Sequence, residues 1–149
     1  MDKGMIALIS AIIKEIDYKS ANILHDLNLT KMEGVYLTII HNSPGISQYD
    51  IARMQNADKS LIVKHITNLE KKEFIKKIEI DSRKKGIYLT NNGEKAVEFI
   101  KKNLSSLEKE LFSGINQGEI ELFFDLMIHI KNKLELSNER EHFVYNLKK

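Results

Sequence analysis

The hydrophobic positions of the first 27 residues recur at steps of three and four, which is the spacing of one face of an α-helix. These apolar positions are Ile6, Ile9, Ile13, Ile16, Ile23 and Leu24. Charged residues such as Lys14, Glu15 and Asp17 fall between them. The pattern therefore predicts an amphipathic helix over residues 5–27.

A capping signal opens the next predicted helix. Thr30 is followed three residues later by Glu33, which is the spacing of a capping box. The apolar face behind this signal consists of Val35, Tyr36, Ile39 and Ile40. The run Asn42-Ser43-Pro44-Gly45 ends the helix, because proline and glycine interrupt helical structure.

Two further capping residues delimit a pair of short helices. Ser47, with Asp50 three residues later, opens the first, which ends near Asn56, a residue type that tolerates a left-handed turn. Asp58 opens the second, which runs from Lys59 to about Lys72. Two short helices joined by three or four residues are typical of a helix-turn-helix.

The periodicity then changes from helical to alternating. Apolar and polar residues alternate from Phe74 to Ile80, and a second apolar run covers residues 87–89. Between them lies the polar stretch Asp81-Ser82-Arg83-Lys84-Lys85-Gly86. This arrangement predicts a β-hairpin with a charged tip.

Two long helices are predicted after the hairpin. Thr90 caps a helix that reaches about Leu111, the segment 113–118 breaks it, and a final helix follows. Residues 137–149 form a polar tail. The expected fold class is mainly α with a small β-hairpin, built as one domain over residues 1–149 with a winged helix-turn-helix lobe at about residues 30–90.

Composition narrows the class of protein. The chain has 149 residues, is 42% hydrophobic and 30% charged, and contains one proline and no cysteine. These values exclude collagen-like and disordered chains, and the lack of cysteine excludes disulfides, thiolate zinc sites and thiol redox switches. Ser10 and Lys14 interrupt the apolar runs near the N-terminus, so we expect no signal peptide, no membrane span and a cytoplasmic location.

Positive charge is concentrated in the middle of the chain. Residues 59–85 carry nine Lys and Arg against four Asp and Glu. Residues 1–58 carry five against seven, and residues 86–149 carry nine against ten. A local cationic region on a nearly neutral chain indicates a polyanionic partner at one face.

The predicted helix at 59–72 has two distinct faces. Ile62, Ile66 and Leu69 share one side, whereas Ser60, Lys64, Thr67 and Lys71 share the other, flanked by Val63 and Asn68. In a DNA major groove Lys64 could donate to guanine, Asn68 could pair with adenine, and the methyl groups of Thr67 or Val63 could contact thymine. For an isolated segment, a solvated helix face explains the same pattern.

The predicted hairpin favours a DNA-contacting face over a merely solvated one. Its tip carries Arg83, Lys84 and Lys85, and arginine suits the narrow, negative minor groove. Asp81 is expected to hold the Arg83 guanidinium through a charge-assisted hydrogen bond. A basic hairpin directly after a helix-turn-helix is the wing of a winged helix, so nucleic-acid binding is the favoured interpretation.

At this point the chain resembles the MarR family of winged-helix transcriptional regulators. The resemblance is carried by the run Ile46–Ala52, by the helix after Asp58, and most specifically by the stretch from Asp81 to Gly93. That stretch matches the D-x-R wing and the following L-T-x-x-G of the family. In element order the resemblance covers about residues 5–136.

The resemblance implies a homodimeric regulator, a repressor by expectation, that binds a pseudo-palindromic double-stranded DNA operator and is released by a small-molecule ligand. The residues expected to contact DNA are Ser47, Gln48, Lys59, Ser60, Val63, Lys64, Thr67, Asn68, Lys71, Asp81, Arg83, Lys84 and Lys85. Dimerisation is expected in the helical regions 5–27 and 95–136, because their apolar residues exceed what a small winged lobe can cover. These dimerisation residues are Ile6, Ile9, Ile13, Ile16, Phe123, Phe124, Met127 and Ile130.

The chain departs from the family pattern at two positions. Glu73 stands where the family usually has glycine, so it must either adopt a left-handed turn or change how the helix ends. Its carboxylate also lies in the basic segment, which lowers the affinity expected for an operator. His65 stands at a core-flanking position that is generally apolar in the family.

No catalytic motif competes with this interpretation. The five histidines are scattered, and no H-E-x-x-H, G-x-S-x-G or phosphate-binding glycine loop is present, so we expect no enzyme activity, no metal and no cofactor. The aromatic residues Tyr36, Phe99, Phe123 and Phe124 either line a ligand pocket or pack in the core. The alternative function is a winged-helix protein-interaction module, an antirepressor or adaptor, but such a module would have lost the basic residues that this chain retains.

Overall fold

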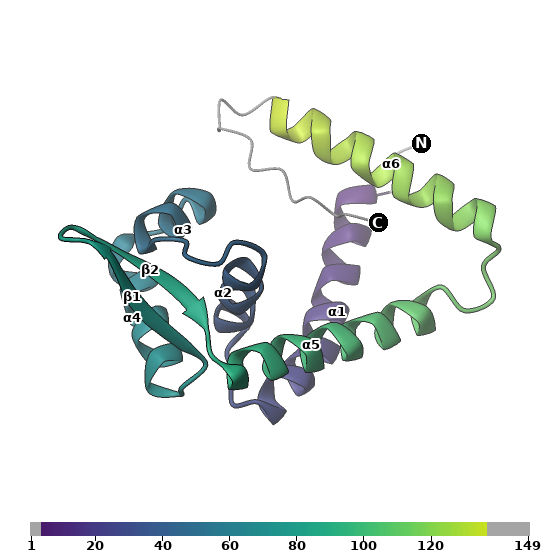
Figure 1. Cartoon of the computed structure of the whole chain (residues 1–149). Coiled ribbons are helices and arrows are strands. Elements are labelled where there is room, and N and C mark those ends of the chain that lie inside the picture. Colours follow the sequence, from purple (N-terminus) through teal and green to yellow (C-terminus); the bar gives the residue numbers. More distant parts are fainter. Residues whose placement is uncertain (1–3, 137–149) are drawn as a thin grey trace. The chain divides into compact units, whose positions relative to one another are not determined.

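The computed structural model of the protein describes residues 4–136, which form six helices and one β-hairpin (Figure 1). The elements are α1 (Met5–Asp26), α2 (Lys31–Asn42), α3 (Gln48–Gln55), α4 (Lys59–Lys71), β1 (Ile75–Asp81), β2 (Lys84–Leu89), α5 (Asn91–Leu111) and α6 (Gln117–Leu136). The mainly helical fold class with a small hairpin is thus confirmed. The polar tail at 137–149 lies outside the described residues.

The chain divides into two compact units, with the boundary between Ser105 and Ser106. The first unit contains the winged-helix lobe together with α1 and most of α5. Among residues 4–136, no helix is long and apolar enough to cross a membrane.

Local side-chain caps begin the helices of the lobe at the predicted residues. The hydroxyl of Thr30 accepts from the amide of Glu33 at 3.2 Å, and the amide of Thr30 donates to the Glu33 carboxylate at 2.9 Å, which completes the predicted capping box. Ser47 caps α3 through the amide of Asp50 at 3.1 Å. Asn56 ends α3 with a φ of 46°, as its tolerance for the left-handed region predicts.

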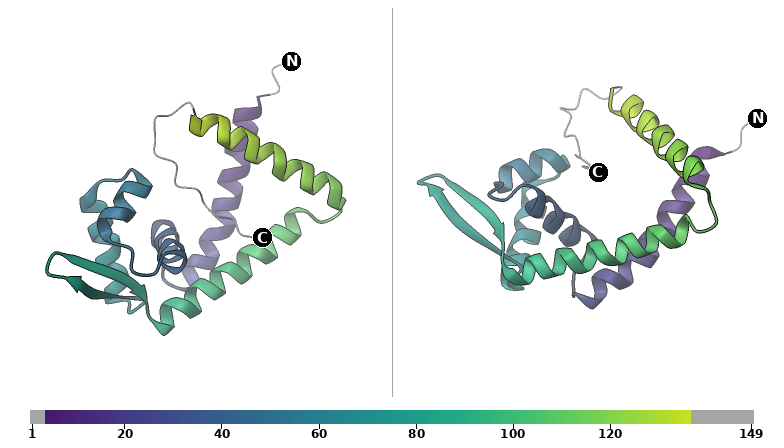
Figure 2. Two further views of the ribbon diagram at one scale, coloured as in Figure 1. Left: turned by 45° about the horizontal axis from the view of Figure 1, so that its top comes forward. Right: turned by 45° about the vertical axis from the view of Figure 1, so that its right-hand side comes forward.

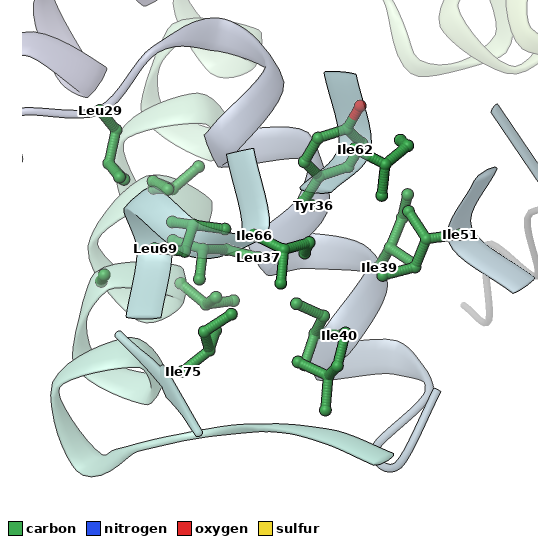
Figure 3. Close-up of a cluster of buried hydrophobic side chains, with 14 of the residues drawn as sticks. Leu29, Tyr36, Leu37, Ile39, Ile40, Ile51, Ile62, Ile66, Leu69 and Ile75 are labelled. Carbon is green, nitrogen blue, oxygen red and sulfur yellow. The ribbon is translucent and has the colours of Figure 1, made fainter. Parts of the chain in front are cut away.

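The core of the lobe lies between α2, α4 and the hairpin (Figure 3). The fully buried side chains with the largest volumes include Tyr36, Leu37 and Ile40 of α2 and Ile62, Ile66 and Leu69 of α4. The core face predicted for α4 is therefore confirmed. Because α4 is fixed by this packing, its opposite face is held outward.

The hairpin is anchored at its base and free at its tip. In the antiparallel register Ile75 pairs with Leu89 and Ile78 with Gly86, and a bulge occurs between Glu79 and Asp81. The amide of Ile87 donates to Ile46 at 2.9 Å, which ties β2 to the loop before α3. Figures 1 and 2 show the tip projecting beyond α3 and α4.

Glu73 adopts the left-handed turn that the sequence left as one of two possibilities, with a φ of 60°. The amide of Phe74 donates to Leu69 at 3.0 Å and the amide of Glu73 donates to Glu70 at 3.0 Å. These two bonds form a Schellman motif, in which glycine is the usual residue at the left-handed position. The glutamate therefore ends α4 as glycine does, at the cost of backbone strain.

Glu73→Gly is expected to raise the free energy of unfolding by about 1 kcal/mol, because glycine adopts positive φ without a Cβ clash. Urea denaturation measures the change. Glu73→Ala is the matched control, since it removes the carboxylate but keeps the strain. An alanine variant that gains as much stability as the glycine variant would show that charge, and not backbone conformation, causes the effect.

In the second unit, an aromatic cluster packs α6 against the turn that follows α5. The ring centroid of Phe112 lies 5.7 Å from that of Phe123 and 5.6 Å from that of Phe124. The side chain of Asn116 accepts from the amide of Glu119 at 2.9 Å and caps α6. Most of the remaining apolar side chains of α6 are exposed.

Candidate nucleic-acid interface

The outer face of α4 presents a row of exposed polar and cationic side chains. Ser60, Lys64 and Lys71 are exposed, and the isopropyl group of Val63 is 48% exposed among them. Thr67 is half-buried on the same face. Leu61, which follows Ser60, is also exposed at the edge of this face. It was not among the predicted DNA-contact residues.

Asn68 differs from the other predicted contact residues of α4. It is half-buried, and its side chain helps to lower the pKa of the Glu33 carboxyl inside the lobe. Pairing of Asn68 with adenine stays a prediction.

The N-terminal ends of α3 and α4 contribute a second part of the surface. Ser47 and Gln48 are half-buried at the start of α3. The ammonium group of Lys59 lies 5.6 Å from the centre of the Tyr49 ring, a cation–π geometry. Tyr49 itself is 61% exposed and was not among the predicted contact residues. A tyrosine two residues after the predicted cap Ser47 was the signal available in the sequence.

The wing tip is cationic and exposed, but Asp81 does not act as predicted. Arg83, Lys84 and Lys85 are all exposed. The Asp81 carboxylate accepts from the backbone amide of Arg83 at 2.8 Å, and no ion pair joins it to the Arg83 guanidinium within the described part of the chain. The expected brace on the guanidinium is therefore wrong: the carboxylate closes an Asx turn, which fixes the backbone of the tip.

A groove of about 710 Å³ lies between the wing and the start of α3. Its lining combines both charges, and the residues are Ser47, Gln48, Tyr49, Asp50, Lys77, Glu79, Asp81, Ser82, Arg83, Lys84, Lys85 and Ile87. The groove thus brings the predicted residues of α3 and of the wing to one site. Lys77 was not among the predicted contact residues. Its ammonium pairs with Glu70 of α4 at 3.3 Å, and the sequence carries no signal for a contact between these two elements.

Glu33 and Lys72 form an ion pair that the sequence pattern does not indicate. The Glu33 side chain is 1% exposed, and the ammonium of Lys72 donates to its carboxylate at 2.8 Å. Burial by itself raises the pKa of Glu33, but the hydrogen bonds from Lys72 and the Thr30 amide outweigh burial and hold the pKa below its usual value. Glu33 is therefore ionised at neutral pH.

The candidate ligand residues fall into different surroundings. Tyr36 is fully buried, so packing in the core is confirmed for this residue. Its ring lies 5.5 Å from that of His65, edge to face, and the Tyr36 hydroxyl and His65 Nδ1 have no hydrogen-bond partner among the described residues. Phe99 is at the surface of α5, and Phe123 and Phe124 belong to the aromatic cluster of the second unit. Residues 4–136 contain no group of three or more His, Asp and Glu arranged to hold a metal ion.

The apolar residues expected to mediate dimerisation lie largely at the surface. Ile6 is 77% exposed and Ile13 is 52% exposed on α1. On α6, Phe123, Phe124 and Met127 are exposed. The remaining three, Ile9, Ile16 and Ile130, are half-buried.

Comparison with known proteins agrees with this geometry. Residues 29–85 match the model of the MarR family. The HTH-type transcriptional regulator YybA of Bacillus subtilis is 28% identical over 134 residues, which cover 89% of this chain and 85% of YybA.

Solved structures extend the similarity beyond the lobe. The crystal structure of MarR superposes with a TM-score of 0.78 at 27% identity, covering 92% of this chain and 96% of MarR. The S. aureus MepR–DNA complex superposes with a TM-score of 0.74 at 26% identity, covering 86% of this chain and 96% of MepR. With the helix-turn-helix, the wing and its cationic tip in place, the chain is similar in sequence and fold to the winged-helix transcriptional regulators of the MarR family.

Proposed function

We propose that this transcriptional regulator is a homodimeric repressor that binds a pseudo-palindromic operator. In the proposal α4 enters the major groove and the wing enters the adjacent minor groove. The observation that carries it is the exposed cationic tip at Arg83, which shares one groove with the start of α3. The MepR–DNA complex, a neighbour at 26% identity, supports DNA as the partner.

The dimer is proposed from the exposed apolar side chains of α1 and α6. Ile6 of α1 is 77% exposed and Phe123 of α6 is 47% exposed, each beside further exposed apolar side chains of its own helix, and soluble monomers rarely leave such apolar surfaces uncovered. A two-fold dimer would bury the same patch on both copies. It would also repeat the DNA-binding lobe, which a palindromic operator requires.

We further propose that a noncovalent small-molecule ligand releases the operator. The chain has no cysteine, so oxidation of a thiol cannot be the signal. The ligand would act by favouring a conformation of lower DNA affinity, which requires differential binding to the two conformations.

Capture of genomic fragments by the purified protein, followed by footprinting, tests the operator. The expected result is a protected site with two-fold symmetry, whose half-sites are separated by about one helical turn, roughly 10 base pairs. Sedimentation at micromolar concentration is expected to show a dimer, and Met127→Glu is expected to shift it to monomer. A wild-type monomer that protects no site and captures only proteins would instead support the interaction-module function.

A further inference from the structure

The buried carboxylate of Glu33 connects three elements of the lobe. It lies in the first turn of α2, is fully buried, and accepts from the Lys72 ammonium at 2.8 Å. Lys72 is the C-cap residue of α4 and is 39 residues away in sequence. The other carboxylate oxygen, Oε1, is buried without a hydrogen-bond partner among the described residues. Lys72 is therefore the cation that balances this buried charge.

The same ammonium also reaches the turn between α1 and α2. Lys72 donates to the backbone carbonyl of Asn28 at 2.7 Å. Asn28 has a φ of 53° and lies just beyond the end of α1. One side chain thus joins the end of α4, the start of α2 and the turn that follows α1.

We infer that Glu33 and Lys72 are positioning residues for α4, which fix the C-terminal end of this DNA-contacting helix to α2 and to the α1–α2 turn. A movement of the turn relative to α2 changes the distances to Lys72 and hence the placement of α4. The inference rests on the proposed function, since it assigns these residues an effect on operator recognition without contact to DNA.

The neighbouring lysine provides the contrast on which a test can be built. Lys71 is exposed on the outer face of α4, where a phosphate can approach. The side chain of Lys72 is 27% exposed, and its ammonium is occupied by Glu33 and Asn28. Each lost phosphate contact reduces the steepness with which log K for DNA falls against log salt concentration, called the salt slope below, by about 0.9. Loss of an internal ion pair leaves that dependence unchanged.

The experiment compares full-length wild type, Lys71→Met, Lys72→Met and the double variant Glu33→Gln/Lys72→Met. The double variant leaves no buried charge unpaired, and its glutamine side chain keeps an acceptor for the Thr30 amide, so it serves if the single variant unfolds. Urea unfolding measures stability. Titrations at several salt concentrations measure affinity for the protected genomic fragment and for a random duplex of equal length. Backbone hydrogen exchange is followed at residues 27–30 and 69–74.

The double variant is expected to unfold near the wild-type urea midpoint, to keep the wild-type salt slope, and to lose about fivefold or more of its preference for the protected fragment. Its amides in both segments are expected to exchange faster. Lys71→Met should lower the salt slope and leave the preference within about twofold. A double variant with wild-type preference, or a Lys72→Met slope reduced as much as that of Lys71→Met, would overturn the inference.

Failure of the proposed function gives a different pattern. A wild-type chain without preference for any duplex refutes operator binding. Hydrogen exchange then decides on the positioning role by itself: faster exchange in both segments of the folded double variant supports it, and unchanged exchange refutes it.

Discussion

Arg83→Ala is expected to weaken the binding of every duplex, specific or random, by about 1.5–3 kcal/mol, roughly tenfold or more. The guanidinium is exposed at the wing tip and has no ion-pair partner among residues 4–136, so no internal contact is lost with it. Arginine in the minor groove responds to the phosphate backbone and to the negative potential of the groove more than to base edges. The order in which the protein prefers different DNA sequences should therefore change little. The salt slope should fall by about 1. Competition titrations at two salt concentrations measure both quantities.

Lys64→Met is the control for this prediction, because Lys64 lies on the outer face of α4 and not on the wing. It is expected to change which bases are preferred, by about 1–3 kcal/mol per lost bidentate contact. An Arg83→Ala variant with unchanged affinity would show that the hairpin is not a DNA-contacting wing in this protein.

Two substitutions of Asp81 separate its charge from its hydrogen bond. Asp81→Asn keeps an oxygen that can accept from the Arg83 amide but removes the negative charge, so tighter DNA binding is expected. Asp81→Ala also removes the acceptor and loosens the tip. If the Asx turn aims Arg83, the alanine variant binds more weakly than the asparagine variant. Equal affinities of the two variants would leave the turn without a role.

Gly93→Ala is expected to lower the free energy of unfolding by about 3 kcal/mol or more, above the usual range for overpacking. A Cβ at this position would lie 2.0 Å from the carbonyl oxygen of Phe74 and 3.2 Å from the Leu89 Cβ. The Phe74 carbonyl cannot turn away freely, because it accepts from the amide of Thr90 at 3.0 Å. The start of α5 must therefore move away from the base of the wing. Urea denaturation measures the loss.

Gly118→Ala is the matched control in the first turn of α6. Its nearest neighbour would be the side-chain oxygen of Asn116 at 3.5 Å, which is ordinary contact. Helix propensity favours alanine over glycine by up to about 1 kcal/mol, so this variant is expected to be neutral or more stable. A Gly93→Ala variant that is as stable as Gly118→Ala would contradict the close packing at the α5 start.

The features that could be predicted from the sequence are those determined by neighbouring residues. The caps at Thr30, Ser47 and Asp58 each involve a partner two or three residues away, and all three begin helices as predicted. The left-handed conformation at Glu73 was one of two possibilities, and the Schellman bonds decide it. Local hydrogen bonding thus accounts for the element boundaries.

The errors in the candidate site have a different physical origin. At Asp81, opposite charges two residues apart suggested a side-chain pair, whereas the nearer donor is the backbone amide of Arg83. Lys72 was counted only among the basic residues of segment 59–85, because its partner Glu33 is 39 residues away and the sequence carries no signal for their pairing. The orientation of a side chain depends on tertiary packing, and the spacing of residues along a helix gives no information about that packing.

Because the hairpin is held at its base and free at its tip, its length can change independently of the core of the lobe. No hydrogen bond or ion pair links residues 81–85 to any described helix, while Ile46 and Ile87 hold the base by backbone bonds. Each residue added to both strands would extend the reach by roughly 3.3 Å without altering the core. Residues inserted in matched pairs into the two strands, below the Asp81–Arg83 turn, would thus change the span of DNA that the wing is proposed to contact and leave the turn intact.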